Sequence, residues 1–193
     1  MFRFYLNREL SVRLGFKLSR WKRWSREFLP PDPLGGLQSG FARQYSPAEA
    51  FQVYLGGHLV SNIKCSIPEA KIILADLKEW ISAQYFSYQS VEDPPLVQPQ
   101  AKEYRIYIFM NIDPLQVVQP HHYVVRRVID EEISRGKGAR IVTERYIENW
   151  LKEGETLSLL ESQGAMPHWM AAKILYITKV YQIFTERLKE EVK

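Results

Sequence analysis

Residues 6–30, LNRELSVRLGFKLSRWKRWSREFLP, contain the strongest fold signal in the chain. Leucines recur at helical spacing in the first half of this stretch: Leu6, Leu10 and Leu14. Asn7 is a favourable N-cap residue, and Gly15 follows where helices commonly end in a left-handed residue. The pattern predicts a first helix that ends at about Leu14, followed by a tight turn at residues 15–16.

A second helix is predicted from Lys17 to about Phe28, with two chemically different faces. Its apolar side chains repeat at about 100° per residue and share one face: Trp21, Trp24 and Phe28. Polar and cationic side chains occupy the other face, with Arg20 at the flank: Ser19, Lys22, Arg23 and Arg26. We interpret the tryptophans as core residues in preference to base-stacking residues, and the opposite face as available for phosphates.

Positive charge is concentrated at the start of the sequence. Residues 1–43 hold nine Lys or Arg against three Asp or Glu, whereas the whole chain carries a net charge of +4. A cationic segment on a nearly neutral body is typical of attraction to a polyanion through counterion release. A merely solvated helix face is the alternative, but two helices joined by a short turn are the outline of a DNA-reading helix-turn-helix.

Length and composition set further limits. A chain of 193 residues with 46% hydrophobic content can bury a sizeable core in one or two domains. Cys65 is the only cysteine, which excludes an intramolecular disulfide framework and a thiolate-rich metal cluster within one chain. The first residues lack the apolar core of a signal peptide, and no stretch is as apolar as a membrane span. We therefore expect a cytoplasmic protein without membrane contact.

Turn and helix signals continue after the second helix. Residues 30–43 are rich in Pro and Gly and are the expected place for a wing. Capping-box signatures at Ser46 and Ser66 predict helices from about residues 47 and 67. The first of these two helices is expected to stop near Leu55, because the pair Gly56-Gly57 follows.

The sequence predicts an α+β chain in two domains. Residues 1–86 form the N-terminal domain, the Pro- and Gln-rich residues 87–102 form a linker, and residues 103–193 form a small α+β domain. Residues 103–112, EYRIYIFMNI, are the best strand and read as buried on both faces. Residues 123–133 fit either a strand or a helix, and Thr143 is expected to cap a helix over residues 144–152.

A long helix is expected at residues 167–192. Six apolar residues in it recur at spacings of four and three, as in a heptad seam: Met170, Ile174, Ile177, Tyr181, Phe184 and Leu188. Two interpretations stay open for this seam. It is either a dimerisation surface or the inner face of one amphipathic helix that packs on its own domain.

Five segments of the N-terminal half resemble the MerR family of winged-helix regulators. Residues 15–17 (GFK) stand at the family's Gly-Val-Ser turn, residues 21–25 (WKRWS) at its Leu-Arg-Tyr-Tyr-Glu segment, and residues 28–30 (FLP) at its Gly-Leu-Leu ending with proline. Residues 40–45 (GFARQY) approximate the wing's Gly-Tyr-Arg-x-Tyr, and residues 66–71 (SIPEAK) resemble Ser-Leu-x-Glu-Ile-Lys. The resemblance covers about residues 5–82.

The resemblance implies a dimeric regulator of transcription that binds double-stranded DNA at near-palindromic sites. It implies that the second helix enters the major groove and that a wing touches the adjacent backbone, with Arg43 and Tyr45 serving the wing. The residues expected to contact DNA are then Ser19, Arg20, Lys22, Arg23, Arg26, Arg43 and Tyr45. Arg23 and Lys22 are expected near base edges or phosphates.

Parts of the sequence are also compatible with other functions. A DNA-bridging or protein-interaction module without gene-specific regulation is the main alternative. An enzyme would use the carboxylates at residues 130–132 with Glu144 and Glu148, but no phosphate-binding glycine loop or nucleophile motif accompanies them. His121 and His122 read as a surface turn after Pro120 and not as metal ligands.

The sequence therefore predicts no enzymatic activity, no metal and no cofactor. An unknown effector or a protein partner at the C-terminal domain stays open, because the aromatic strand at residues 104–112 suits an effector pocket or a dimer interface equally well.

Overall fold

The computed structural model describes residues 4–32, 42–86, 103–110, 121–136, 139–151 and 171–189. The chain divides into two compact units. The helical unit comprises residues 1–98 together with 180–193, and the sheet unit comprises residues 99–179. Helices and antiparallel strands are both present, which confirms the α+β class.

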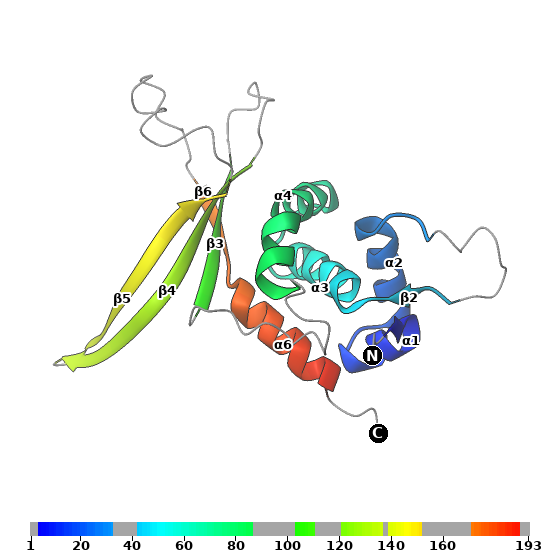
Figure 1. Cartoon of the computed structure of the whole chain (residues 1–193), viewed down its shortest axis with the longest axis horizontal. Coiled ribbons are helices and arrows are strands. Elements are labelled where there is room, and N and C mark those ends of the chain that lie inside the picture. The colour runs from blue at the N-terminus through cyan, green and yellow to red at the C-terminus, as the bar shows by residue number, and fades with distance from the viewer. Residues whose placement is uncertain are drawn as a thin grey trace, which may run out of the picture. The chain divides into compact units, whose positions relative to one another are not determined.

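The helical unit contains four helices from the N-terminal half of the chain (Figure 1). They are α1 (Asn7–Arg13), α2 (Leu18–Phe28), α3 (Pro47–Ser61) and α4 (Ile67–Tyr85). Two short strands, β1 (Tyr5–Leu6) and β2 (Gln44–Tyr45), pair antiparallel with Tyr5 opposite Tyr45. The predicted wing at residues 30–43 falls largely on residues 33–41, which lie outside the described residues.

Local sequence signals account for the starts of α3 and α4. The Ser46 and Ser66 side chains accept hydrogen bonds from the backbone N–H groups of Glu49 and Glu69, and each glutamate carboxylate accepts from the backbone N–H of its serine. Both predicted capping boxes are confirmed. The predicted cap of α1 is wrong, because Leu6 occupies the N-cap position without a side-chain hydrogen bond and Asn7 is the first helical residue.

Helix α3 does not stop at Gly56 and Gly57, contrary to the sequence prediction. It continues to Ser61, and both glycines are buried inside it. A Cβ atom at Gly56 would overlap the ring of Phe28, and a Cβ at Gly57 would overlap the ring of Trp24. The two glycines are therefore explained by the close approach of α2 to α3, whose packing outweighs the low helix propensity of glycine.

An aromatic cluster fills the other side of α3. Phe51 of α3 contacts Tyr181 with ring centroids 5.2 Å apart and Phe184 at 5.1 Å, and Tyr85 lies 4.3 Å from Tyr181. Tyr181 and Phe184 belong to α6 (Ile177–Lys189), which returns from the far end of the sequence to this unit. The helical unit thus completes its core with a segment almost 100 residues away in the sequence.

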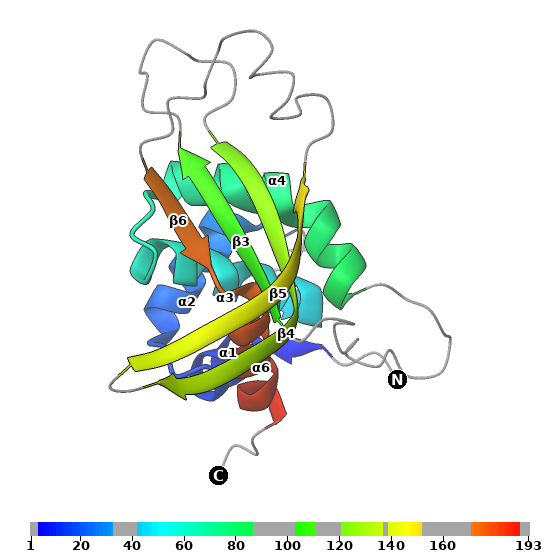
Figure 2. The same cartoon turned by 90° about the vertical axis from the view of Figure 1, so that its left-hand side faces the viewer.

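Four strands form the sheet unit in the order β5-β4-β3-β6 (Figure 2). They are β3 (Glu103–Met110), β4 (His121–Gly136), β5 (Ala139–Trp150) and β6 (Ala171–Leu175), and all neighbours are antiparallel. The predicted strand at residues 103–112 is confirmed over its described part. Its burial alternates, with Tyr104, Ile106 and Ile108 buried and the residues between them half-buried, so the expectation of burial on both faces is wrong.

Residues 123–133, for which the sequence fits either a strand or a helix, lie in strand β4. The predicted helix at residues 144–152 is wrong, because residues 139–150 pair along β4 as strand β5. His121 and His122 begin β4 opposite Met110 and Phe109, so they do not form a surface turn. In each case pairing with a neighbouring strand outweighs the preference of the local sequence.

The predicted long helix at residues 167–192 is also wrong in its first part. Ile174 lies in β6 opposite Tyr107 of β3, and α6 begins only at Ile177. Met170 lies outside the described residues. The remaining seam residues are almost fully buried within the chain: Ile177, Tyr181, Phe184 and Leu188. The seam is therefore the inner face of one amphipathic helix and not an exposed dimerisation surface.

Among the described helices, none combines the length and apolarity needed to cross a membrane.

Candidate nucleic-acid interface

Helix α2 is fixed to the rest of the helical unit by its apolar face. Trp21 is fully buried, and Trp24 and Phe28 are nearly so. The backbone carbonyl of Phe28 also accepts a hydrogen bond of 2.7 Å from Nε2 of Gln52 on α3. The interpretation of Trp21 and Trp24 as core residues is confirmed, and their burial excludes them from base stacking.

The turn between α1 and α2 has the geometry that the sequence predicted. Gly15 has a φ of 72°, and the N–H of Phe16 donates to the Ser11 carbonyl at 2.8 Å. Two arginines join this turn to the end of α6. Arg187 donates to the Leu14 carbonyl, and Arg13 donates to the Leu188 carbonyl, each at 2.8 Å. These hydrogen bonds and the turn at Gly15 together fix the orientation of α2 relative to α1.

Tyr45 has a structural role in place of the predicted DNA contact. Its side chain is 1% exposed, and its hydroxyl donates to Oδ1 of Asn7 at 2.7 Å. The Ser25 hydroxyl is hydrogen-bonded to the Tyr45 hydroxyl oxygen, also at 2.7 Å. The prediction that Tyr45 contacts DNA is wrong, because its side chain is buried and bonds α1 to α2, so that it positions α2.

The opposite face of α2 is exposed along the full length of the helix. All five predicted contact residues on it are exposed: Ser19, Arg20, Lys22, Arg23 and Arg26. Lys22, Arg23 and Arg26 have no hydrogen-bond or ion-pair partner within the described part of the chain. Arg20 lies over the Trp24 ring at 5.9 Å. Lys22, Arg23 and Arg26 therefore present their charges to solvent without an ion pair in the described residues.

One acidic residue of α2 lies next to this face. Glu27 forms an ion pair of 2.8 Å with Lys71 of α4. The hydrogen bond from Lys71 holds the pKa of Glu27 below its ordinary value, and attraction to Lys71, Arg23 and Arg26 acts in the same direction. Because Lys71 neutralises Glu27, the carboxylate does not cancel the charge of the arginines beside it.

Arg43 is occupied by contacts within its own unit. Nη1 donates to the Pro30 carbonyl at 2.8 Å, Nη2 lies 3.4 Å from the Glu49 carboxylate, and the guanidinium lies over the Tyr45 ring. Arg43 therefore joins the two ends of the segment between α2 and β2, which differs from its predicted role as a DNA contact.

The carboxylates considered for catalysis do not converge on one another in the described residues. Glu144 binds Arg105 through both oxygens, at 2.6 and 2.9 Å. Glu148 pairs with Arg126, and Asp130 pairs with Arg145. The side chain of Glu131 lies outside the described residues. Asp130, Glu144 and Glu148 each face an arginine, an arrangement that explains them as cross-strand ion pairs of the sheet, whereas Glu132 lies opposite Thr143 of β5.

Two features escaped the sequence analysis. Lys17 occupies the N-cap position of α2, is exposed, and extends the cationic face by one residue. Its charge is evident from the sequence, but its N-cap position is not, because helix N-caps normally favour Ser, Thr, Asp or Asn. A cavity between α3 and α4 was also missed, because its walls come from three separate segments whose spacing forms no motif.

No protein-family model matches the chain, and no curated protein matches it either.

Proposed function

We propose that the chain is a sequence-specific DNA-binding regulator of transcription, of MerR-like winged helix-turn-helix type, which acts as a dimer and inserts α2 into the major groove. The observation that carries this proposal is the two-sided character of α2. One face is fixed by Trp21, Trp24 and Phe28, and the other presents cations that have no partner within the described residues.

The charges suit the backbone of DNA, and the rigidity of α2 suits sequence recognition. Every cation that meets a phosphate releases counterions, which supplies affinity that does not depend on sequence. Reading of base edges requires side chains held at a fixed angle, and the α1–α2 turn and the Tyr45 hydroxyl provide this. In the proposed complex Arg23 and Lys22 lie nearest the base edges, and Arg20, Arg26 and Ser19 contact phosphates.

The dimer is part of the proposal without an assigned interface, since α6 buries its apolar seam within the chain. Sedimentation of the protein with a DNA duplex that carries one binding site tests the proposed dimer. Two protein chains per near-palindromic site support the proposed regulator, and one chain per site contradicts the dimer.

The first test selects sheared genomic fragments with purified protein at about 150–200 mM salt, where non-specific binding is weak. We expect a near-palindromic motif among the recovered fragments. Recovery without any motif, or no better than that of a Lys22→Glu/Arg23→Glu/Arg26→Glu variant, would contradict gene-specific binding and would favour a DNA-bridging or protein-interaction module.

The second test assigns a role to one arginine. Arg23→Ala is expected to weaken binding to the selected site by about 1–3 kcal/mol while leaving binding to unrelated duplexes almost unchanged, because a bidentate base contact is lost. Arg145→Ala is the matched control, since Arg145 is an exposed arginine of the sheet unit. Fluorescence anisotropy over a series of salt concentrations measures both effects. Equal losses on all sequences would refute a base-reading role for Arg23.

A further inference from the structure

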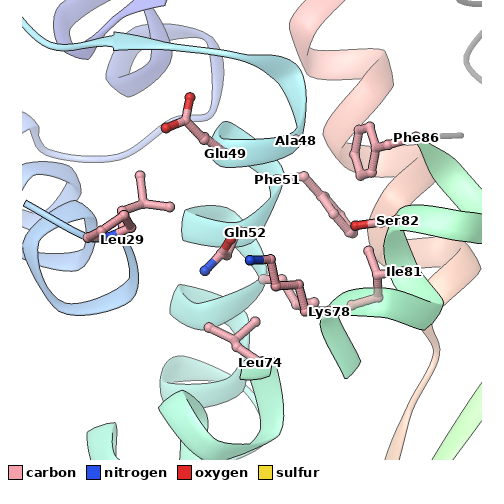
Figure 3. A pocket seen from close by; sticks show the side chains of 12 residues that line it. Leu29, Ala48, Glu49, Phe51, Gln52, Leu74, Lys78, Ile81, Ser82 and Phe86 are labelled. Atoms are coloured by element: carbon pink, nitrogen blue, oxygen red, sulfur yellow. The ribbon is translucent and has the colours of Figure 1, made fainter. Parts of the chain in front are cut away.

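A cavity of about 260 Å³ lies in the helical unit, between the end of α2 and the helices α3 and α4 (Figure 3). Its walls are largely apolar: Leu29, Phe51, Leu55, Leu74, Ile81 and Phe86. Four polar side chains also reach it, namely Glu49, Gln52, Lys78 and Ser82. Apolar walls with a few convergent polar groups are the usual composition of a small-molecule site.

Two of the four polar side chains are already engaged. Glu49 Oε2 caps α3 through Ser46, and its Oε1 lies beside Arg43. Gln52 donates to the carbonyl of Phe28. These bonds compensate the negative charge of Glu49, so the carboxylate does not determine which ligand the cavity accepts.

Lys78 differs from these two residues. No hydrogen-bond or ion-pair partner for it exists in the parts of the chain that the structure describes. In Figure 3 its amine points into the space between the labelled side chains, on the side of Gln52. The charged group at this cavity that has no partner in the described residues is therefore positive, and Ser82 adds a hydroxyl donor to the lining.

We propose that this cavity binds a small organic anion, a carboxylate with an apolar body. The carboxylate pairs with Lys78, and the body lies against Leu55, Leu74 and Ile81. The volume equals that of about nine water molecules, which suits a ligand of around ten non-hydrogen atoms. A cationic ligand would meet Lys78 with a like charge, and a fully polar ligand would leave the apolar walls uncovered.

The position of the cavity connects ligand binding to α2. Leu29 and Pro30, which directly follow α2, form part of the wall, and Gln52 lines the cavity while it bonds the last residue of the helix. A ligand in contact with these residues acts on the end of α2. We infer that it changes the affinity for DNA, and this second part rests on the proposed function.

The binding part is tested without DNA, on the full chain, by titration with octanoate, octanol and octylammonium. Calorimetry or NMR chemical shifts give the affinity. We expect octanoate to bind up to about fivefold more tightly than octanol, the range of a solvent-exposed ion pair, and octylammonium to bind more weakly than both. Failure of octanoate to bind, or equal binding of all three probes, would overturn the site.

Two variants locate the site. Lys78→Gln keeps the stem of the side chain and removes its charge, so it should abolish the preference for octanoate over octanol. Lys189→Gln, an exposed lysine of α6 that does not line the cavity, should leave the preference unchanged. A preference that survives in Lys78→Gln would show that octanoate binds elsewhere and would overturn the assignment.

The regulatory part is tested by measuring DNA affinity with and without saturating octanoate. We expect a change of about fivefold or more in the wild-type protein and none in Lys78→Gln. Octanoate binding without this change would overturn the coupling alone. A protein that binds octanoate but shows no specific DNA binding would overturn the proposed function and leave the cavity assigned as a ligand site.

Discussion

Gly57 of α3 lies under the indole ring of Trp24, where an added methyl group would overlap the ring. We predict that Gly57→Ala lowers the free energy of unfolding by about 1–3 kcal/mol, the usual cost of overpacking. Helix propensity alone predicts the opposite sign, a gain of roughly 1 kcal/mol. Urea denaturation therefore separates the two effects by the sign of the change.

A double-mutant cycle provides the control for this prediction. In a Trp24→Leu background the ring is absent, and Gly57→Ala should cost much less or become favourable. If the cost is the same in both backgrounds, the close approach of Trp24 is not the reason for the glycine.

Some features of single residues can be predicted from local sequence patterns. The capping boxes at Ser46 and Ser66 were predictable because each depends on two residues three positions apart. The exposed and buried faces of α2 were predictable for a similar reason, since the helical period alone separates Trp21 from Arg23. Tyr45 was misassigned because its partners, Asn7 and Ser25, lie on other elements.

At the scale of elements, the strands β4, β5 and β6 show the limit of local patterns. Thr143 and the residues after it have the apolar spacing of a helix, yet they form β5 because β4 offers a partner along its whole length. Residues 171–175 continue the apolar seam of α6, yet they pair with β3. Nothing within a short window of sequence reports the presence of a neighbouring strand.

Ion pairs across the strands make the stability of the sheet depend on pH. The hydrogen bonds from Arg105 hold the pKa of Glu144 below its ordinary value. The unfolded chain therefore takes up a proton at this residue before the folded chain does, so the stabilisation is present at neutral pH and is lost as the pH falls through the folded pKa.

We predict that Glu144→Gln lowers the free energy of unfolding at pH 7 by about 0.5–1 kcal/mol and has a smaller effect at pH 3. Asp130→Asn is the control, because its pair with Arg145 is largely exposed and should contribute almost nothing at either pH. Urea denaturation at the two pH values measures the differences. An effect of Glu144→Gln that stayed constant with pH would contradict the role of its charge.

At the scale of the whole molecule, the helical unit is built from two distant parts of the sequence. The boundary between residues 98 and 99 lies inside the linker that the sequence predicted at residues 87–102. The return of residues 180–193 to the helical unit was not predicted, because a heptad-like pattern does not specify which surface it contacts. Tyr181, Phe184 and Leu188 are all buried.

We predict that a fragment of residues 1–98 does not fold stably by itself. It lacks the α6 side chains that cover Phe51 and Tyr85, as well as the arginine bond to the Leu14 carbonyl. Circular dichroism should show a broad thermal transition with a low midpoint temperature. A synthetic peptide of residues 177–193 should raise this temperature. A peptide with Phe184→Ala should fail to do so. Cooperative unfolding of the fragment alone would contradict the requirement for α6.

The late position of α6 in the sequence has a consequence for synthesis on the ribosome. Helices α1–α4 are complete by Tyr85, but Tyr181 is translated almost 100 residues later. At about 5–20 residues per second, the exposed apolar side of α3 waits on the order of ten seconds for its partner. A chain released before residue 177 would carry the cationic face of α2 on a core that lacks Tyr181 and Phe184.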